Sequence, residues 1–177
     1  MAGLRDARAT AIIASSYCWD DPMTRYWQDL KVGDTFSTSD SLTLSREDIL
    51  EFAAEFDPQP YHLDKEAAEA SIFGGLCASG WQVSAMMMRL LTDTFHDQAI
   101  ALLGVASVQQ MRWKIPVFAG DSLRAEITVI DSNETSGQAG IGTVDVEIKV
   151  SNQKEQAVIV LQNRLLIPHG ELELAHG

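Results

Sequence analysis

The segment FDPQPYHLD, residues 56–64, contains two side chains whose types and spacing are suited to proton transfer. Asp57 supplies a carboxylate and His62 an imidazole, and both groups act as general acids and bases in enzymes. Residues five apart do not share one face of a helix, but a loop restricted by Pro58 and Pro60 lets both side chains converge on one point. The same pattern is also typical of a helix end and turn whose polar groups only satisfy the backbone. This loop by itself therefore leaves both interpretations open.

A helix before this segment is predicted to carry Asp57 to its position. In the stretch SREDILEFAAEF, Ser45 is a suitable N-cap and Asp48 follows three residues later, which is a capping-box pattern. Four apolar residues then recur at helical spacing and predict one buried stripe: Ile49, Phe52, Ala53 and Phe56. Pro58 disfavours helical geometry in the residue before it, so we expect Asp57 at the helix exit and an extended path from there to His62.

The residues after this loop predict a short helix, a glycine-rich loop and a long central helix. Asp64 is placed to cap the polar turn LDKEAAEAS, and IFGGLCASG then forms the loop. In the following stretch, SGWQVSAMMMRLLTDTF, Arg89 is the only charged residue between Ser79 and Leu91. A helix that is apolar on nearly all sides is expected to be buried on nearly all sides. Ser79 is more typical of a helix N-cap than of a nucleophile, because the sequence places no histidine to activate it.

Strand patterns on both sides of the helices predict an antiparallel sheet. YWQDLKVGDTFSTSDSLTLS is typical of strand, turn and strand around Gly33-Asp34. SLRAEITVID and TVDVEIKV alternate between apolar and polar residues, and AVIVLQNRLLI follows as a last strand. The predicted buried face consists of Leu123, Ala125, Ile127, Val129, Val144, Val146, Ile148 and Val150. Such a sheet needs a cover on its dry face, so we expect an α+β domain in which the sheet wraps one central helix.

Composition restricts the classes of function. The 177 residues are enough for one domain, and a formal net charge of −12 argues against nucleic-acid partners. Two cysteines do not form a disulfide framework, and four scattered histidines lack metal-ligand spacing. No apolar run is long enough to span a bilayer, so we expect a cytoplasmic protein without a membrane partner. We expect a flexible arm over residues 1–22, one domain over 23–170 and a polar tail over 171–177.

Three segments in this order resemble the MaoC-like dehydratase family, which includes the (R)-specific enoyl-CoA hydratases and has a hot-dog fold. The family's loop G-D-x-N-P-hydrophobic-H-x-D is similar to FDPQPYHLD, and its F-G-x-x-I-A-H-G is similar to FGGLCASG. MRWKIPVFAGDSLRAEITV resembles the family's proline, V-x-x-G-D turn and following strand. The resemblance extends from about Asp29 to Ile167. Three residues depart from the family pattern, with Phe56 in place of a glycine, Gln59 of an asparagine and Ser79 of a histidine.

The resemblance implies a hot-dog domain that hydrates enoyl thioesters. Water would add to C3 of a trans-2-enoyl thioester, with Asp57 and His62 as the acid/base pair that holds the water. The Gly80 backbone N–H would donate to the thioester oxygen as it gains charge. The resemblance also implies substrate-binding roles for Gln59, Gly75, Ser79, Arg112 and Lys114. Coenzyme A or a carrier protein would carry the acyl group, and no metal or other cofactor is expected.

Two other functions on the same fold stay open. Hot-dog thioesterases usually place a carboxylate on the central helix, whereas residues 79–92 contain no Asp or Glu. The substitutions at Gln59 and Ser79 instead suggest a non-catalytic subunit that binds acyl thioesters. For each of these functions we expect a homodimer or a higher homo-oligomer, because a hot-dog monomer leaves a sheet edge open for pairing.

Overall fold

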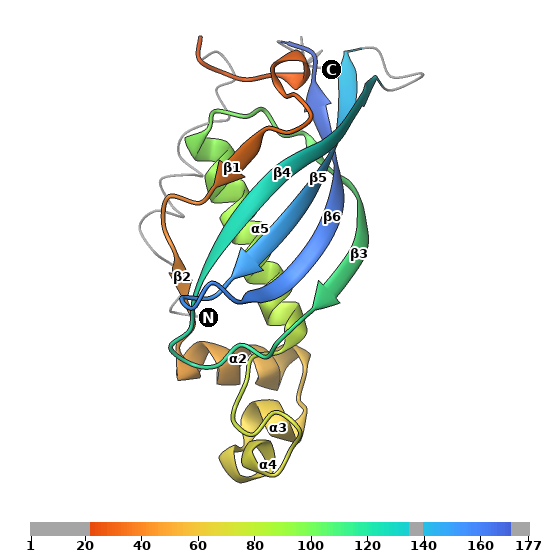
Figure 1. Cartoon of the computed structure of the whole chain (residues 1–177). Helices are drawn as coiled ribbons and strands as arrows, with labels where there is room; N and C mark the ends of the chain where they lie inside the picture. Colours follow the sequence, from red (N-terminus) through yellow and green to blue (C-terminus); the bar gives the residue numbers. More distant parts are fainter. Residues whose placement is uncertain (1–21, 135–139, 171–177) are drawn as a thin grey trace.

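The protein consists of a curved antiparallel sheet that wraps one long helix, with short helices gathered at one end of it (Figure 1). The computed structural model describes residues 22–134 and 140–170. The helix is α5, Gly80–Asp97, and the sheet has the strand order β1-β4-β5-β6-β3, with β2 paired to β4. The strands are β1 (Thr35–Ser37), β2 (Leu42–Thr43), β3 (Gly104–Trp113), β4 (Ser122–Glu134), β5 (Ile141–Ser151) and β6 (Ala157–Pro168). The predicted α+β architecture with a wrapped helix, as in a hot-dog fold, is confirmed.

The inner face of the sheet forms the core with α5. Every predicted inward-facing residue of β4 and β5 is at most 3% exposed, so the alternation in the sequence predicted this face correctly. The buried side of α5, which includes Met87, Leu91 and Phe95, belongs to the same cluster. This packing fixes the direction of α5 and therefore the place of its first turn, where the candidate site lies.

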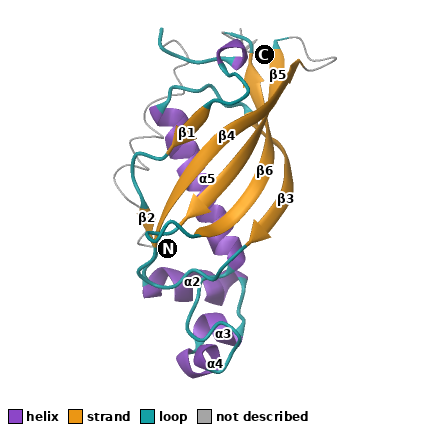
Figure 2. Ribbon diagram, viewed as in Figure 1, coloured by secondary structure: helices purple, strands orange, loops and turns teal. Residues whose placement is uncertain are grey.

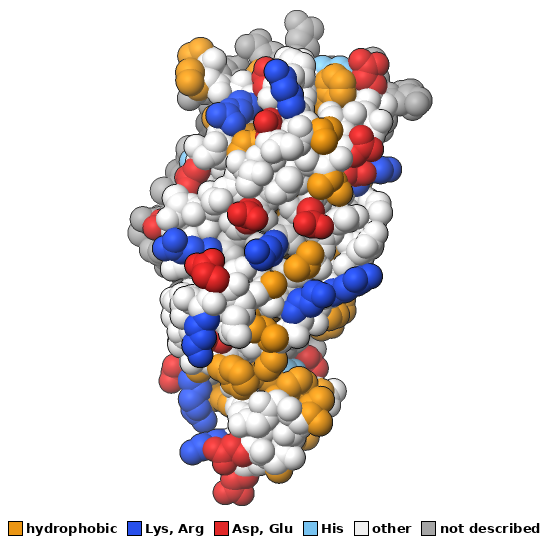
Figure 3. Space-filling model, in the orientation of Figure 1, with side chains coloured by type: hydrophobic (Ala, Val, Ile, Leu, Met, Phe, Trp, Pro, Cys, Tyr) orange, Lys and Arg blue, Asp and Glu red, His pale blue; other side chains and the backbone are white. Residues whose placement is uncertain are grey.

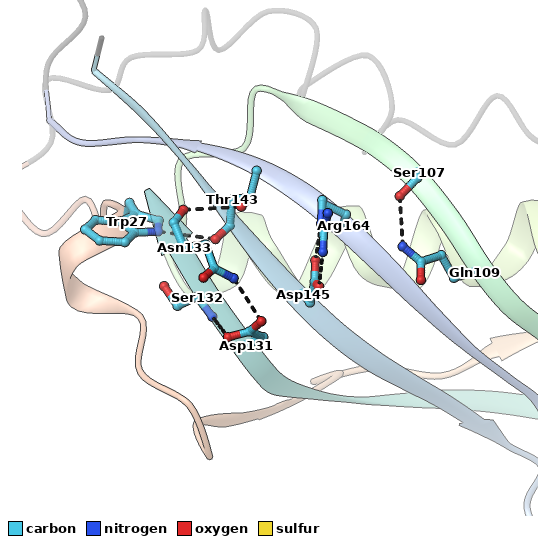
Figure 4. Close-up of polar contacts among 9 residues, drawn as sticks. All are labelled: Trp27, Ser107, Gln109, Asp131, Ser132, Asn133, Thr143, Asp145 and Arg164. Atoms are coloured by element: carbon cyan, nitrogen blue, oxygen red, sulfur yellow. Dashed lines mark hydrogen bonds and ion pairs between the residues drawn. The ribbon is translucent and has the colours of Figure 1, made fainter. Parts of the chain in front are cut away.

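The outer face of the sheet is polar. Arg164 on β6 binds Asp145 on β5 through two hydrogen bonds, of 2.7 Å and 2.6 Å (Figure 4). Charged side chains of both signs are interspersed over the strands on this face, whereas hydrophobic side chains gather toward the end that carries α2 and α3 (Figure 3). An antiparallel sheet with one dry and one wet face is the arrangement that the alternating sequence requires.

The chain before β1 differs from the prediction of a strand, a turn and a second strand. Residues Trp27–Asp29 form a 3-10 helix, η1, and the turn at Gly33, whose φ is 97°, leads directly into β1. The Trp27 indole packs against β5 at Gly142, where a β-carbon would collide with the ring, and its Nε1 donates to the Thr143 carbonyl oxygen at 3.3 Å (Figure 4). Packing of one large aromatic ring therefore replaces the predicted strand pairing.

Three short helices lie at the end of α5 that begins with Gly80 (Figure 2). They are α2 (Arg46–Phe56), α3 (Pro60–Leu63) and α4 (Lys65–Glu69). The predicted capping box of α2 is confirmed, because the Asp48 N–H donates to the Ser45 hydroxyl at 3.1 Å and the Ser45 N–H to the Asp48 carboxylate at 3.0 Å. Phe56 departs from the predicted buried stripe and is 63% exposed, since it lies at the last turn of α2, beyond the sheet.

α5 is less buried than its composition predicts. Trp81 is 63% exposed, and Ala85, Thr92 and His96 are also exposed on the same side of the helix. The spacing of these residues follows one helical stripe, because the sheet curves round only part of the helix. The expectation of burial on nearly all sides was therefore wrong for this stripe.

Within residues 22–134 and 140–170, no helix is long and apolar enough to cross a membrane. The predicted arm, apart from Pro22, the predicted tail and His176 lie outside the described residues. His169 is half-buried and stacks on Trp27 with a centroid distance of 4.6 Å.

Candidate active site

The structure brings the Asp57 carboxylate to the start of α5. Asp57 is the C-cap of α2, as predicted, and its N–H donates to the Ala53 carbonyl oxygen at 3.0 Å. The Ser79 hydroxyl donates to Asp57 Oδ2 at 2.7 Å, so a residue of the α5 cap holds the carboxylate that ends α2. The Asp57 side chain is 25% exposed, and Ser79 is fully buried. One oxygen of Asp57 is therefore fixed beside the first turn of α5.

His62 lies in a helical turn rather than in the extended segment that the prolines predicted. Pro60 occupies the first position of α3, where its fixed φ and missing N–H are compatible with a helix. The His62 N–H donates to the carbonyl oxygen of Gln59, which precedes that turn in an extended conformation. His62 is 5% exposed, and its ring packs against Tyr61 and Phe73 with centroid distances of 4.6 Å and 6.5 Å. The helical turn directs the imidazole inward, toward α5.

The hydrogen bonds of His62 determine which of its ring nitrogens faces Asp57. Nδ1 lies 2.7 Å from the Cys77 carbonyl oxygen, which can only accept, so Nδ1 carries a proton. In the neutral imidazole the lone pair is then on Nε2, which lies 3.6 Å from Asp57 Oδ2. This separation is longer than a direct N–H···O hydrogen bond. Asp57 Oδ2 and His62 Nε2 are therefore two proton acceptors that lie side by side. One group with two donor hydrogens, such as a water molecule, would be able to donate to both.

The first turn of α5 supplies backbone N–H groups next to this pair. Ser79 is the N-cap, as predicted, and its hydroxyl accepts from the Trp81 N–H at 3.2 Å. Gly80, the first helical residue, has no hydrogen-bond partner for its N–H within the described part of the chain. Its carbonyl oxygen accepts from Trp113 Nε1 at 2.9 Å, and a β-carbon on Gly80 would lie 3.0 Å from the Trp113 ring. A side chain at position 80 would therefore require the indole to move by a few tenths of an ångström.

Two of the remaining predicted residues, Gly75 and Gln59, form no side-chain hydrogen bond with the pair. Gly75 is half-buried, and a β-carbon there would lie 3.5 Å from the Phe118 ring, which is an ordinary contact. Gln59 is exposed and contributes its backbone carbonyl to the His62 turn. Neither position by itself indicates how a substrate binds.

Arg112, near the end of β3, and Lys114, just beyond it, are exposed, and within the described residues neither side chain binds Asp57 or His62 through a hydrogen bond or an ion pair. Arg112 pairs with Val160, on the outer face of the sheet, whereas Trp113 pairs with Ile159 and faces α5. The substrate-binding role of these two cations stays a prediction. Within the described residues, no three side chains of His, Cys, Asp or Glu gather as a metal site would require.

Sequence reasoning missed two groups of the site, the Cys77 carbonyl and the Trp113 indole. A backbone acceptor has no signature in the sequence, and the contact between Trp113 and Gly80 joins residues 33 positions apart. The Cys77 side chain is buried, and this burial raises the pKa of its thiol. The thiol therefore stays neutral beside His62, with Sγ 3.8 Å from Nδ1.

Comparisons with known proteins show which family the chain resembles. Residues 29–152 match the MaoC-like domain family. The chain is 34% identical over 140 residues to the uncharacterized protein YdeM of Bacillus subtilis, covering 78% of this chain and 96% of that protein. It is 28% identical over 111 residues to the (R)-specific enoyl-CoA hydratase of Rhodospirillum rubrum, covering 62% of this chain and 73% of that enzyme. The crystal structure of a MaoC-like dehydratase from Rhodospirillum rubrum superposes with a TM-score of 0.76 at 33% identity, covering 84% of this chain and 99% of that one.

Proposed function

Because the chain belongs to the MaoC-like dehydratase family, we propose that it is an (R)-specific enoyl-thioester hydratase or dehydratase. The observation that carries the proposal is the pair formed by Asp57 and His62 at the start of α5, with 3.6 Å between Oδ2 and Nε2. The similarity to an (R)-specific enoyl-CoA hydratase supports the reaction class.

The protonation of His62 assigns the first proton transfer. Nε2 is the unprotonated nitrogen of the neutral ring, because Nδ1–H donates to the Cys77 carbonyl. A water that donates one proton to Nε2 and the other to Asp57 Oδ2 would keep its oxygen lone pairs free to attack C3 of the substrate. As the new C–O bond forms, the water proton passes to His62, and the resulting imidazolium is stabilised by the Asp57 carboxylate.

The electrons of the C2–C3 double bond move toward the thioester oxygen, which becomes enolate-like. The Gly80 N–H would donate to this oxygen, and the first turn of an 18-residue helix adds partial positive charge there. A proton from the acid/base pair then completes the addition at C2. The net reaction is addition of one water to the double bond, and the same steps in reverse are the dehydration.

Ser79 is proposed to hold the carboxylate in place for this chemistry. Its hydroxyl donates to Asp57 Oδ2 and accepts from the Trp81 N–H, so one side chain both caps α5 and orients Asp57. In this proposal the serine that departs from the family pattern is a positioning residue, and neither a substrate ligand nor a nucleophile.

The proposal is tested by following the loss of enoyl absorbance with crotonyl-CoA and with longer trans-2-enoyl-CoAs. Asp57→Asn should abolish hydration, whereas Asp64→Asn, which makes the same change of charge at an exposed N-cap of α4, should keep it. The product should be the (R)-3-hydroxyacyl thioester by chiral chromatography. Equal rates for wild type and Asp57→Asn on all substrates would refute the proposal.

The two alternative functions, a thioesterase and a non-catalytic binding subunit, predict different results with acyl-CoA substrates. A thioesterase would release free thiol from saturated acyl-CoA. The carboxylate of α5 that lies closest in sequence to its start is Asp93, which is more than three turns from Gly80 and already binds Arg89 at 2.8 Å. A non-catalytic subunit would bind acyl thioesters with no turnover by the wild type.

We propose that the substrates are thioesters of coenzyme A or of a carrier protein. We also propose that the protein forms a homodimer. β3 is an edge strand with Val108 49% exposed, and Trp81 is exposed on the neighbouring helix α5. A second copy that pairs along β3 would cover both. Light scattering should give twice the chain mass of 19.4 kDa, and a monomer at micromolar concentration would contradict it.

A further inference from the structure

The side-chain amide of Gln82 joins the two helices that carry the candidate site. Gln82 lies on α5, one turn after the cap residue Ser79, and is 7% exposed. Its Nε2 donates to the Asp48 carbonyl oxygen of α2 at 2.8 Å. Because α2 ends at Asp57 and α5 begins at Gly80, this bond connects the helix of the carboxylate to the helix of the proposed oxyanion donor.

The hydrogen bond from Gln82 is not needed to satisfy the backbone of α2. Asp48 lies in the first turn of that helix, where a carbonyl oxygen regularly accepts from the N–H four residues later. Within the described residues, the Gln82 side chain also buries an oxygen, Oε1, that has no hydrogen-bond partner. A methionine of similar size would avoid the cost of burying that oxygen, so stability alone does not account for the amide.

Apolar packing holds α2 against the protein but restricts its orientation less than hydrogen bonds do. Ile49 and Ala53 are both 0% exposed, and Ile49 belongs to the core cluster. Burial of apolar surface is non-directional, whereas a hydrogen bond weakens steeply when its angle changes. Hydrogen bonds to α5 therefore oppose small rotations and translations of α2 that apolar contacts oppose only weakly.

Two hydrogen bonds from α5 hold α2 near its two ends. The Ser79 hydroxyl binds Asp57 Oδ2 at 2.7 Å, and the Gln82 amide binds Asp48 near the start of the helix. At about 1.5 Å per residue, Asp48 and Asp57 are roughly 14 Å apart along α2. With the Ser79 bond alone, α2 would be free to pivot at its end, and the carboxylate would turn relative to His62 Nε2, which lies 3.6 Å from Oδ2.

We propose that Gln82 is a positioning residue for the reaction, which holds α2 on α5 and thereby fixes the direction of the Asp57 carboxylate. The proposal rests on the function proposed above, because the carboxylate binds the attacking water there. Gln82 Nε2 is occupied by Asp48 and Oε1 is buried, so Gln82 acts through α2 and not on a substrate. Its loss should therefore lower kcat and leave KM nearly unchanged.

Two substitutions of Gln82 test this role with crotonyl-CoA. Gln82→Met keeps the size of the side chain and removes the donor, and kcat should fall about fivefold, as expected for one hydrogen bond. In Gln82→Glu, the side chain donates to the Asp48 carbonyl only when it is protonated. The ratio of kcat in Gln82→Glu to kcat in wild type should therefore rise as the pH falls, whereas the ratio for Gln82→Met should stay constant.

Thr94→Val is the matched control for stability. Thr94 lies near the other end of α5, is 1% exposed, and donates from its hydroxyl to the Leu90 carbonyl oxygen at 2.8 Å. Thr94→Val also removes one buried hydrogen bond to a helix carbonyl, so it should lower the urea midpoint and keep the wild-type kcat and KM. An equal fall in kcat in Thr94→Val would show that Gln82→Met acts through stability alone, which would refute the positioning role.

Hydrogen exchange separates this inference from the proposed function, because it does not depend on activity. The α2 amides, including the Asp57 N–H bonded to the Ala53 carbonyl, should exchange faster in Gln82→Met and at the wild-type rate in Thr94→Val. If wild type hydrates no enoyl-CoA, the hydratase proposal fails, and faster exchange would still show that Gln82 holds α2. If wild type is active but Gln82→Met keeps its kcat, the positioning role is wrong and the hydratase proposal stands. Unchanged exchange in Gln82→Met would overturn the role of Gln82 in holding α2.

Discussion

Replacing Ser79 by alanine separates two roles that this one side chain combines. Its hydroxyl donates to Asp57 Oδ2 at 2.7 Å and accepts from the Trp81 N–H at 3.2 Å, as the N-cap of α5. Loss of an N-cap costs about 1 kcal/mol of stability. Loss of a hydrogen bond to a charged group costs about 1.5–3 kcal/mol, and the partial exposure of Asp57 favours the lower end of that range.

Loss of this hydrogen bond is expected to raise the activation free energy by about 1.5 kcal/mol, because Asp57 is then less well oriented in the transition state. An increase of this size lowers kcat about tenfold. KM should change little, because in this scheme Ser79 touches the carboxylate and not the substrate. Ser79→Thr keeps a hydroxyl group and should recover part of kcat. Initial rates with crotonyl-CoA, measured over a range of substrate concentrations, separate kcat from KM.

Ser45→Ala is the matched control, since Ser45 caps α2 through the Asp48 N–H and contacts neither Asp57 nor His62. Ser45→Ala should lower the free energy of unfolding in urea by about 1 kcal/mol, the cost of a lost N-cap, and should leave kcat unchanged. If Ser45→Ala and Ser79→Ala lose equal stability and both keep the wild-type kcat, the positioning role of Ser79 is refuted.

Three further outcomes are expected. Gly80→Ala would bring a β-carbon to 3.0 Å from the Trp113 ring, so the ring and the first turn of α5 must separate by a few tenths of an ångström, and kcat/KM for crotonyl-CoA should fall about tenfold as the oxyanion donor moves. The Cys77 thiol, whose pKa burial raises above its ordinary value of 9.0, contributes stability that is fully present below that pH and is lost above it. The urea midpoint of wild type should therefore fall more steeply above pH 9.0 than that of Cys77→Ala, and parallel curves would contradict this. Ala85→Lys, on the exposed stripe of α5, should shift the light-scattering mass toward 19.4 kDa, and an unchanged dimer would show that this stripe lies outside the interface.

Local patterns in the sequence predicted those parts of the fold that depend on neighbours along the chain. The alternation in β4 and β5 identified their buried residues, because a strand places successive side chains on opposite faces. The capping residues Ser45, Asp64 and Ser79 were predicted from their type and position, and the structure confirms all three. The family resemblance then connected the loop around Asp57 and His62 to a reaction class.

The predictions that differ from the structure are those that required a partner far away in the chain. The segment around Trp27 has the composition of a strand, but its indole finds space against Gly142 and the chain forms η1 instead. The pair of prolines before His62 suggested an extended path, whereas Pro60 begins a helical turn that buries the imidazole. The apolar composition of α5 did not reveal that one side of the helix would remain uncovered at Trp81.

The sequence alone determined the types of the reactive groups, their loop and the elements that carry them, because caps, turns and alternation act over a few residues. Only the tertiary structure decided how these groups are presented. The Cys77 carbonyl fixes the proton of His62, Ser79 orients Asp57, and Trp113 closes over Gly80. The hydrogen bond from Gln82 to α2 likewise became visible only when α5 was placed beside α2. Each of these contacts joins separate elements, and its geometry depends on how the sheet curves round α5, which no short segment of the chain encodes.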